Sequence, residues 1–341
     1  MHQRIRSKNK IHSTGIYLPK QIVKSDHLFE EIRSESQYDI DKCWMSEKMG
    51  ITERRMAPST SKPSDLAIPA AQKALESCED LSLQDIDLII FCGIERDQPE
   101  PATAHIIQDA LGLSARYAFD IANACFGFID AMQVADSYIR SGVARYALVV
   151  TGEVPTRVLR AAVDMLKRGV DIKTARSIIG ALSVGDAGGA VIIGPVKNGE
   201  KSGFELFNTN SFSYLANKCM YKTDKDGSIS GHMNMAQITS AFIKCHYGLI
   251  DDTLEQLGWN EFDWVLTHQI GQKPFDRLAN MNGVSPNKMI KTLDKLGNIT
   301  SATFPVNFKK LADEEEVVKG DRIGGCFAGS GLVVGQFGYT Y

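Results

Sequence analysis

One segment of this 341-residue chain reads as a strand, a sharp turn and a helix, the unit from which α/β folds are built. The apolar run Ala118–Ile121 predicts the strand, and Asn123–Cys125 predicts the turn. Apolar residues then recur at helical spacing until Ser141-Gly142, where the helix is predicted to end. Cys125 would lie at the helix N-terminus, where unpaired N–H groups and the helix dipole favour a thiolate. Because a free cysteine is more often a buried apolar residue, a nucleophile needs further support.

Two later segments supply hydrogen-bonding partners for such a nucleophile. His268 ends the strand predicted over Trp264–Thr267, and a histidine at the carboxyl end of a strand faces the cleft of an open α/β sheet. A helix is predicted to open with Pro274 as its first residue. Asn298 lies in the turn-rich loop Gly297–Ser301. Each residue alone is more often structural, but Cys, His and Asn together form a nucleophile with two hydrogen-bonding partners.

These motifs resemble those of β-ketoacyl-acyl-carrier-protein synthase III in the thiolase superfamily. The segments that carry the similarity are Asn123–Phe128, His268-Gln269, Gly297-Asn298 and Gly329–Gly331. The resemblance covers nearly the whole chain and implies an α/β thiolase fold with five layers, helix, sheet, helix, sheet, helix. The implied duplication places the nucleophile in an N-terminal half, residues 1–194, and the His and Asn in a C-terminal half, residues 195–341.

A weak internal repeat agrees with a duplicated fold. Asp85–Ile90 and Glu261–Leu266 both lead from an acidic-apolar-acidic entry into an apolar strand. Gly185–Ile193 and Gly329–Val334 both lead from a glycine-rich turn into a strand. The run Tyr146–Val150 is continuously apolar, as expected for a sheet that is covered on both faces.

The composition is consistent with an enzyme that has a large hydrophobic core, and it argues against a nucleic-acid-binding, membrane-spanning or secreted protein. The chain is 43% hydrophobic with a formal net charge of −3, and no basic run indicates nucleic-acid binding. No segment has the length of a membrane span, and the basic N-terminus lacks the apolar core of a signal peptide. The seven cysteines show neither paired spacing nor a metal-ligand motif. We therefore expect reduced thiols, no metal, no cofactor and a cytoplasmic location.

The resemblance implies a role for each residue of the site. Cys125 attacks an acyl thioester and carries the acyl group. The backbone N–H groups of Cys125 and Ser330 form the oxyanion hole, while His268 and Asn298 direct donors at the enolate oxygen of a second thioester. The implied substrates are acyl-CoA or acyl-carrier-protein thioesters, and the implied assembly is a homodimer.

Three further positions match substrate contacts of the family. Trp44 stands where the family stacks the CoA adenine, and Lys48 stands where an arginine usually follows. Lys273 stands where a basic residue docks the carrier protein. The usual His-Gln-Ala-Asn is replaced by His268–Gly271, ending in Ile-Gly, which puts the carrier contacts in doubt. Ordinary solvated charge is the alternative explanation for the two lysines.

The source of the enolate divides the family. Decarboxylative members obtain it from a malonyl unit without a general base. In the relatives that join two acyl-CoA chains head to head, and in the similar pyrone synthases, a glutamate on a loop from the dimer partner is proposed as the base. The segment Glu95–Ala104 resembles their Arg-Asp-x-x-Glu-Pro-x-Thr pattern, and Glu100 matches the carboxylate. The alternative is an exposed loop charge between two prolines.

We therefore expect a ketosynthase that joins two acyl thioesters by a Claisen condensation without decarboxylation, giving a β-keto product or a pyrone precursor. A decarboxylative synthase that uses malonyl-acyl-carrier protein is the first alternative, and acyl transfer to a hydroxyl or an amine is the second. A papain-like hydrolase shares the order Cys, His, Asn, but Cys125 follows a buried strand, unlike the hydrolase nucleophile. A non-catalytic partner subunit commonly loses the cysteine that this chain retains.

Overall fold

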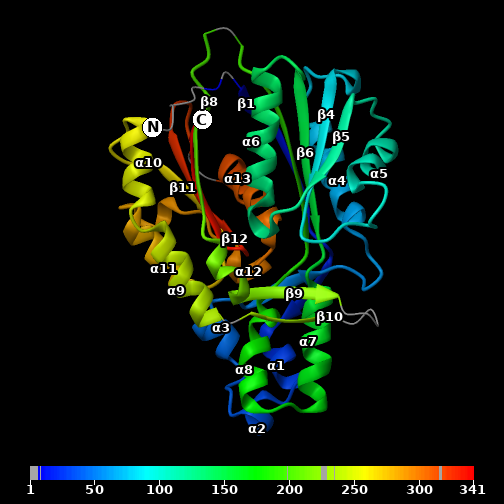
Figure 1. The fold of residues 1–341 in the computed structure, drawn as a ribbon, viewed down its shortest axis with the longest axis vertical. Helices are drawn as coiled ribbons and strands as arrows, with labels where there is room; N and C mark the ends of the chain where they lie inside the picture. Colours follow the sequence, from blue (N-terminus) through cyan, green and yellow to red (C-terminus); the bar gives the residue numbers. More distant parts are fainter. Residues whose placement is uncertain (1–6, 8, 198, 224–228, 234, 315–316) are drawn as a thin grey trace.

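Two mixed β-sheets, with helices between and outside them, form the body of the protein (Figure 1). The structure is a computed structural model that describes residues 7, 9–197, 199–223, 229–233, 235–314 and 317–341. The first sheet has the order β1 (Asn9–Tyr17), β7 (Ala187–Pro195), β6 (Tyr146–Glu153), β4 (Ile86–Cys92), β5 (Tyr117–Ile121). The second sheet has the order β11 (Trp264–Thr267), β12 (Arg322–Gly329), β13 (Val333–Thr340), β8 (Gly203–Ser211).

The two sheets share one strand order. Numbered within its own set of strands, the first sheet runs 1-5-4-2-3. The second runs 1-5-4-2 from β8 to β11, and a parallel bridge between Val265 and Met289 stands where strand 3 would pair. This repetition is the duplicated α/β fold that was expected. The division at residues 194 and 195 stays a prediction.

Helices complete five layers around the sheets. The outer side of the first sheet carries α4 (Pro63–Glu76) and α5 (Thr103–Ala110). Between the sheets lie α6 (Gly127–Arg140) and α13 (Thr303–Glu314), whose Phe128 and Phe304 rings stack with centroids 5.6 Å apart. The outer side of the second sheet carries α9 (Met235–His246), α10 (Leu249–Leu257) and α11 (Gln272–Met281) (Figure 1). The central helices therefore share one buried apolar core with the inner faces of both sheets.

A smaller helical unit covers one end of the sheets (Figure 1). It consists of α1 (Ser25–Glu31), α2 (Ser34–Tyr38), α3 (Trp44–Lys48), α7 (Thr156–Arg168), α8 (Ile172–Ile178) and η3 (Ile179–Ser183). The fully buried Arg54 of β3 (Glu53–Met56) joins two parts of this unit, because its guanidinium donates to the Leu182 carbonyl of η3 at 2.7 Å and to Ser25 Oγ of α1 at 2.9 Å. The remaining elements are β2 (Gln21–Lys24), β3 (Glu53–Met56), β9 (Cys219–Thr223), β10 (Ile229–Met233), α12 (Leu293–Leu296), η1 (Leu83–Asp85), η2 (Ala124–Phe126), η4 (Ser213–Lys218), η5 (Pro286–Lys288) and η6 (Thr300–Ala302).

Most local predictions agree with these elements. The strand–turn–helix unit appears as β5, η2 and α6, and the helix ends at Arg140 with Ser141 as its cap. The prediction that a helix opens with Pro274 is wrong by two residues, because α11 begins at Gln272. Proline is tolerated there because the N–H groups of the first helical turn have no intrahelical partner. All seven cysteines carry free thiols, and no helix of the described residues is long and apolar enough to cross a membrane.

Candidate active site

Cys125 lies in the tight turn η2, between β5 and α6. The residue before it, Ala124, has φ of 47°, a left-handed conformation that costs an L-residue roughly 1–2 kcal/mol. Two bonds close the turn: the Phe126 N–H donates to the Asn123 carbonyl at 3.1 Å, and Asn123 Nδ2 donates to Asp130 on α6 at 2.6 Å. The strained turn is therefore fixed by its neighbours, and it holds Cys125 two residues before Gly127, the first residue of α6.

The end of β12 approaches this turn closely. A Cβ on Gly329 would lie 2.9 Å from the Asn123 carbonyl oxygen and 3.0 Å from the Phe126 nitrogen, so this position requires glycine. Ser330 follows directly and lines the same pocket as Cys125. The structure thus brings together the two residues expected to form the oxyanion hole, and their role as backbone donors stays a prediction.

His268 directly follows β11. Its backbone N–H donates to the Cys326 carbonyl at 3.0 Å, which extends the pairing of β11 with β12 by one residue. The side chain is 5% exposed, and burial lowers its pKa to about 4, so the imidazole is neutral near pH 7. Nδ1 is buried without a partner among the described residues. An unpaired acceptor at Nδ1 costs less than an unpaired buried N–H would, which favours the neutral tautomer with its proton on Nε2. The Nε2 N–H is then the donor available to the pocket.

The loop of Asn298 is held from both sides. The Asn298 N–H donates to the Ser183 carbonyl at 2.9 Å, and its carbonyl accepts from the Gly185 N–H at 3.1 Å. Gly297 has φ of 66°, and a Cβ there would lie 2.5 Å from the Ser183 oxygen. The Thr300 N–H donates to Asn298 Oδ1 at 3.0 Å. This bond fixes the amide and leaves Nδ2 as a donor for the pocket.

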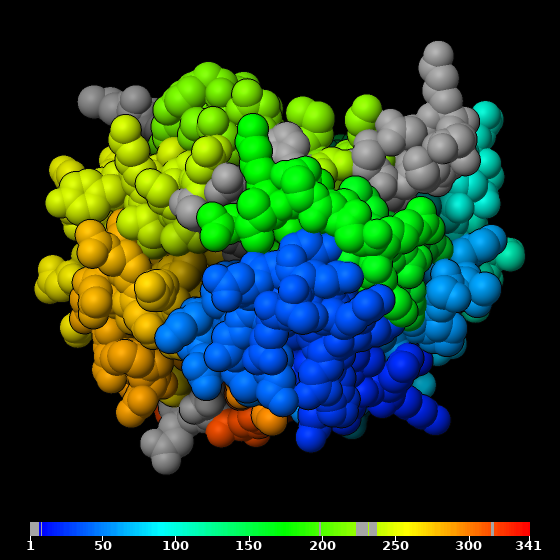
Figure 2. All heavy atoms as spheres, turned by 90° about the horizontal axis from the view of Figure 1, so that it is seen from below, coloured from blue at the N-terminus to red at the C-terminus, as the bar shows by residue number. Residues whose placement is uncertain are grey.

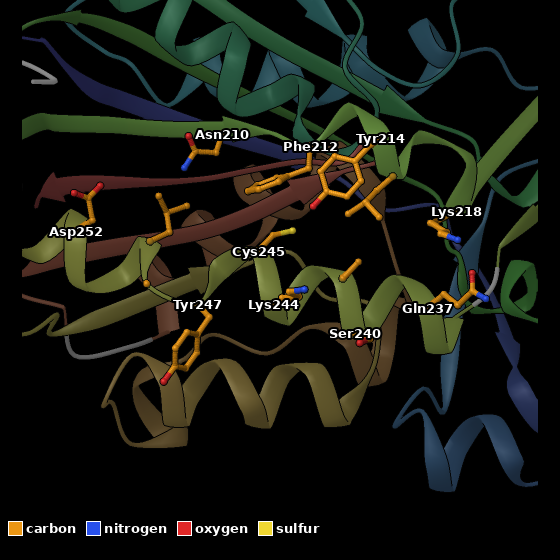
Figure 3. Close-up of a pocket in the computed structure, with 14 residues that line it drawn as sticks. Asn210, Phe212, Tyr214, Lys218, Gln237, Ser240, Lys244, Cys245, Tyr247 and Asp252 are labelled. Atoms are coloured by element: carbon orange, nitrogen blue, oxygen red, sulfur yellow. The ribbon is translucent and has the colours of Figure 1, made fainter.

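The four predicted residues Cys125, His268, Asn298 and Ser330 line one pocket. Its enclosed volume is only about 60 Å³, which is too small for a long acyl chain. The lining residues Leu215, Lys218 and Ala241 also belong to an open groove of about 790 Å³. Figure 3 shows this groove, with Phe212 and Tyr214 on one side and α9 on the other. The groove therefore adjoins the buried site.

The expected thiolate at Cys125 is not favoured in this pocket. Burial raises the pKa of the Cys125 thiol well above its ordinary value, and the nearby Glu153 carboxylate raises it further. Although the side chain is half-exposed to the pocket, the surrounding protein desolvates it. Burial and the neighbouring charge thus oppose the favourable effect expected from the helix N-terminus.

Glu100 lies outside this pocket. It is exposed on the loop between β4 and α5, and it forms no hydrogen bond or ion pair with the described residues. The same loop is anchored by Asp97, which accepts from the N–H of Ser64 at 2.9 Å and from its hydroxyl at 2.6 Å, while the Asp97 N–H donates to Thr103 Oγ1 at 3.2 Å. The structure therefore presents Glu100 on a fixed loop, away from the Cys125 of its own protomer.

The predicted substrate contacts Trp44, Lys48 and Lys273 come from adjoining elements. The Gln272 N–H on α11 donates to the Met49 carbonyl, just after α3, at 2.9 Å. Trp44 is half-buried, whereas Lys48 and Lys273 are exposed. Figure 2 shows the face on which the blue segment of α1–α3 lies against the orange segment of α11. None of the three lines the pocket of Cys125.

The altered motif after His268 packs against α3. A Cβ on Gly271 would lie 2.8 Å from Met49 Cε, the end of a flexible side chain that would have to shift to admit another residue. Gln269, whose function the sequence did not reveal, clamps the segment that leads toward Asn298. Its Nε2 donates to the Ile290 carbonyl at 2.7 Å, and its Oε1 accepts the N–H groups of Thr292 and Leu293 at 3.0 and 2.9 Å.

Sequence reasoning also missed Glu153, the last residue of β6. It is 1% exposed and lies close enough to Cys125 to alter the thiol's pKa. An acidic residue that ends a continuously apolar strand was the available signal. The described residues contain no group of three or more His, Cys, Asp or Glu side chains that could hold a metal ion.

Comparisons with known proteins agree with this geometry. Family profiles match residues 119–213 (3-oxoacyl-[acyl-carrier-protein] synthase III) and residues 254–340 (the C-terminal part of the same enzyme). The β-ketoacyl-[acyl-carrier-protein] synthase III of Clostridioides difficile is 30% identical, covering 97% of this chain and 98% of its own. The enzyme of Deinococcus deserti is also 30% identical, over 93% of this chain and 87% of its own.

A solved structure extends the similarity to the fold. A crystal structure of a variant of Xanthomonas campestris OleA superimposes with a TM-score of 0.91 at 25% identity, covering 98% of this chain and 97% of that one. Further OleA structures, one of them with cerulenin bound, give the same TM-score. The chain therefore belongs to the 3-oxoacyl-[acyl-carrier-protein] synthase III family, the condensing enzymes of the thiolase superfamily.

Proposed function

We propose that this protein is a ketosynthase that loads an acyl group on Cys125 and condenses it with a second acyl thioester without decarboxylation. The convergence of Cys125, His268, Asn298 and Ser330 on one pocket carries the proposal. A tetrahedral oxyanion on the acyl group needs donors beside the sulfur, and the neighbouring backbone N–H groups of Cys125 and Ser330 can supply them. The enolate oxygen of the second thioester needs separate donors, which neutral His268 and the oriented amide of Asn298 can supply.

The base for the second thioester is proposed to be Glu100 of the partner subunit. In its own protomer Glu100 is exposed and makes no contact with the pocket residues, which is what a residue that acts in trans requires. The anchored loop and the flanking Pro99 and Pro101 limit how far the carboxylate can move. Burial in a partner's apolar pocket would raise its pKa, which a carboxylate needs in order to act as a carbon base.

A homodimer is proposed from the free edge of the first sheet. β5 is the edge strand, and its exposed Tyr117 and half-buried Phe119 and Ile121 are apolar. Pairing of this edge with a second copy would be isologous, and it would bring each Glu100 loop toward the partner. An obligate interface of this kind buries more than about 2,000 Å².

Complementation between two inactive variants tests the base and the dimer together. Cys125→Ala removes the nucleophile, and Glu100→Gln removes the base while keeping its shape. When the two proteins are mixed and exchange subunits, about half of the dimers are mixed, and each mixed dimer holds one complete site, so about a quarter of wild-type condensation should return. No recovery after demonstrated subunit exchange would refute catalysis in trans. Glu79→Gln, an exposed carboxylate elsewhere, is the matched control.

Thioesters of CoA or of an acyl-carrier protein are the proposed substrates. Lys273 borders an open surface pocket with two other exposed basic residues, Lys244 and Arg277. Together they form a basic face that suits the phosphates of CoA or an acidic carrier. Trp44 and Lys48 adjoin this face through the contact between α3 and α11.

The decarboxylative reaction is the alternative, and the names of the similar curated proteins favour it. The same Glu100→Gln variant separates the two reactions. If the protein uses unactivated acyl-CoA through Glu100, the variant still acylates Cys125 but forms no product from two saturated acyl-CoA molecules. A wild-type protein that condenses only malonyl donors, with Glu100→Gln unaffected, would establish the decarboxylative reaction instead.

A further inference from the structure

Glu153 is a buried carboxyl group that the condensation scheme above does not use. It ends β6, is 1% exposed and does not line the pocket of Cys125. No lysine, arginine or histidine of the described residues forms an ion pair or hydrogen bond with it. An unpaired buried carboxylate is costly, so its retention calls for a role beyond packing.

A chain of hydrogen bonds fixes this carboxyl group. The Ser301 hydroxyl donates to Glu153 Oε1 at 2.5 Å, and the backbone N–H of Ile94 donates to both carboxylate oxygens at 3.3 Å. Thr151 Oγ1 lies 2.7 Å from Ser301 Oγ. Because the single Ser301 hydroxyl hydrogen is donated to Glu153, the Thr151 hydroxyl is the donor in its contact with Ser301 Oγ.

These contacts join Glu153 to three parts of the proposed site. Ser301 belongs to η6, which packs between β6 and the turn η2 that carries Cys125. The preceding residue of η6, Thr300, orients the Asn298 amide through its N–H. Ile94 lies at the start of the loop that leads to Glu100. Through Ser301 and Ile94, the Glu153 carboxyl group thus contacts the segments that hold Cys125, Asn298 and Glu100.

The groups that face Glu153 leave its charge uncompensated. Its carboxylate acts on two thiols, Cys125 on η2 and Cys92 on β4, and raises the pKa of both. The neighbouring acidic residue Asp186, just before β7, already accepts bonds from the N–H groups of Ala57 and Thr156. Within the described structure, a negative charge on Glu153 therefore acts on the Cys125 thiol and on the buried Cys92 thiol.

We propose that Glu153 is a positioning residue of the condensing site, which holds the Asn298 loop through Ser301 and places a titratable negative charge behind Cys125. The inference rests on the proposed role of Cys125 as the acyl carrier. Burial raises the pKa of Glu153 to about 7, so its charge changes near neutral pH. Below that pH the carboxyl group is neutral and does not oppose a thiolate, whereas above it the carboxylate disfavours ionisation of Cys125.

The pH dependence of iodoacetamide alkylation at Cys125, followed by peptide mass spectrometry, tests the charge. Glu153→Gln keeps the shape and one acceptor for Ser301 but removes the charge, so the alkylation midpoint should fall by roughly one pH unit. The control Glu95→Gln removes a carboxylate that is paired with Arg157 instead, and the midpoint should stay at the wild-type value. An unchanged or raised midpoint in Glu153→Gln would overturn the electrostatic part of the proposal.

Glu153→Asp tests the positioning part separately. It keeps the charge but shortens the side chain, so the Ser301 contact weakens and the Asn298 loop loses its support. Condensation should fall by about tenfold to a hundredfold while the alkylation midpoint stays at the wild-type value. Full condensation activity in Glu153→Asp would refute the positioning role.

The wild-type protein gives a test that needs no variant. The alkylation rate follows the thiolate fraction, so its logarithm should rise less steeply near pH 7, where Glu153 ionises, than on either side, and a constant slope through that pH would contradict the coupling. Alkylation needs no thioester, so it still reports on Glu153 if Cys125 fails to take up an acyl group. Absence of the acyl adduct would count against the proposed function, whereas the alkylation results bear only on Glu153.

Discussion

Replacement of Asn298 separates the two half-reactions, because its amide is already oriented in the structure. The Thr300 N–H holds Asn298 Oδ1 at 3.0 Å, which leaves Nδ2 as the donor for the enolate oxygen. Loss of one preorganised donor lowers a rate by about 10²–10³, or about 2.7–4 kcal/mol of transition-state stabilisation. Asn298→Ala should therefore slow condensation by about 10²–10³ and leave acylation of Cys125 within about tenfold of wild type.

Asn298→Asp makes the expectation sharper. The carboxylate can still accept the Thr300 N–H, but a negative oxygen replaces the donor beside the developing enolate, so at pH 8 this variant should condense more slowly than Asn298→Ala. Burial raises the pKa of the introduced acid above its usual value of about 3.9. As the pH falls through that pKa the acid becomes a donor, and the deficit relative to Asn298→Ala should shrink.

The assay follows both half-reactions in one mixture. Intact-protein mass spectrometry measures the acyl adduct on Cys125 over time, and chromatography with mass detection measures the condensed product. If Asn298→Ala loses acylation as severely as condensation, the amide acts on Cys125 and not on the enolate. If Asn298→Asp condenses faster than Asn298→Ala at pH 8, the donor assignment is wrong.

Three further outcomes follow from the same geometry. Cys125→Ala should lose the acyl adduct entirely in the mass spectrum, and labelling that persists would move the nucleophile elsewhere. Because burial lowers the pKa of His268 to about 4, its contribution to stability is complete above pH 6.5 and is lost as the pH falls toward 4. Buried His246, whose pKa is lowered to about 3, contributes a similar loss in both proteins, so the loss measured by urea unfolding between pH 7 and pH 5 should be about 2 kcal/mol smaller in His268→Gln than in wild type. Arg54→Met should lower the unfolding free energy by about 3 kcal/mol, because the Leu182 carbonyl and Ser25 lose a charged donor, and an unchanged urea midpoint would contradict this account.

The sequence predicted the features that are encoded locally. Apolar periodicity located β5 and α6 on either side of Cys125, and the polar residue after an apolar strand located His268. Asn298 could be identified because its turn-rich loop matches a family motif. In each of these cases the informative residues are neighbours in the chain, so a short window of sequence contains the physical reason.

Properties that depend on contacts between distant segments could not be predicted from a short window of sequence. The helix argument for a Cys125 thiolate used only residues next to it, whereas Glu153 reaches the site from another strand and opposes the thiolate. The clamp formed by Gln269 depends on the position of the chain around Ile290, which sequence spacing does not fix. Lys273 could be matched to a family position, but the basic face it forms with Lys244 joins two helices that only the fold brings together.

The duplicated topology relates the candidate residues to equivalent positions of the two sheets. In the two sheets, the segment after strand 2 carries Glu100 and His268, and the segment after strand 3 carries Cys125 and, farther along the chain, Asn298. Strand 4 ends in Glu153 in the first sheet and leads directly to Ser330 in the second. Strands 2 and 4 run parallel in each sheet, as do strands 2 and 3 of the first sheet, so these carboxyl ends collect at one edge of each sheet. Duplication of one βαβ pattern thus places these residues at corresponding ends of the two sheets, and divergence of the paired positions gives different chemical groups for the proposed two-step condensation.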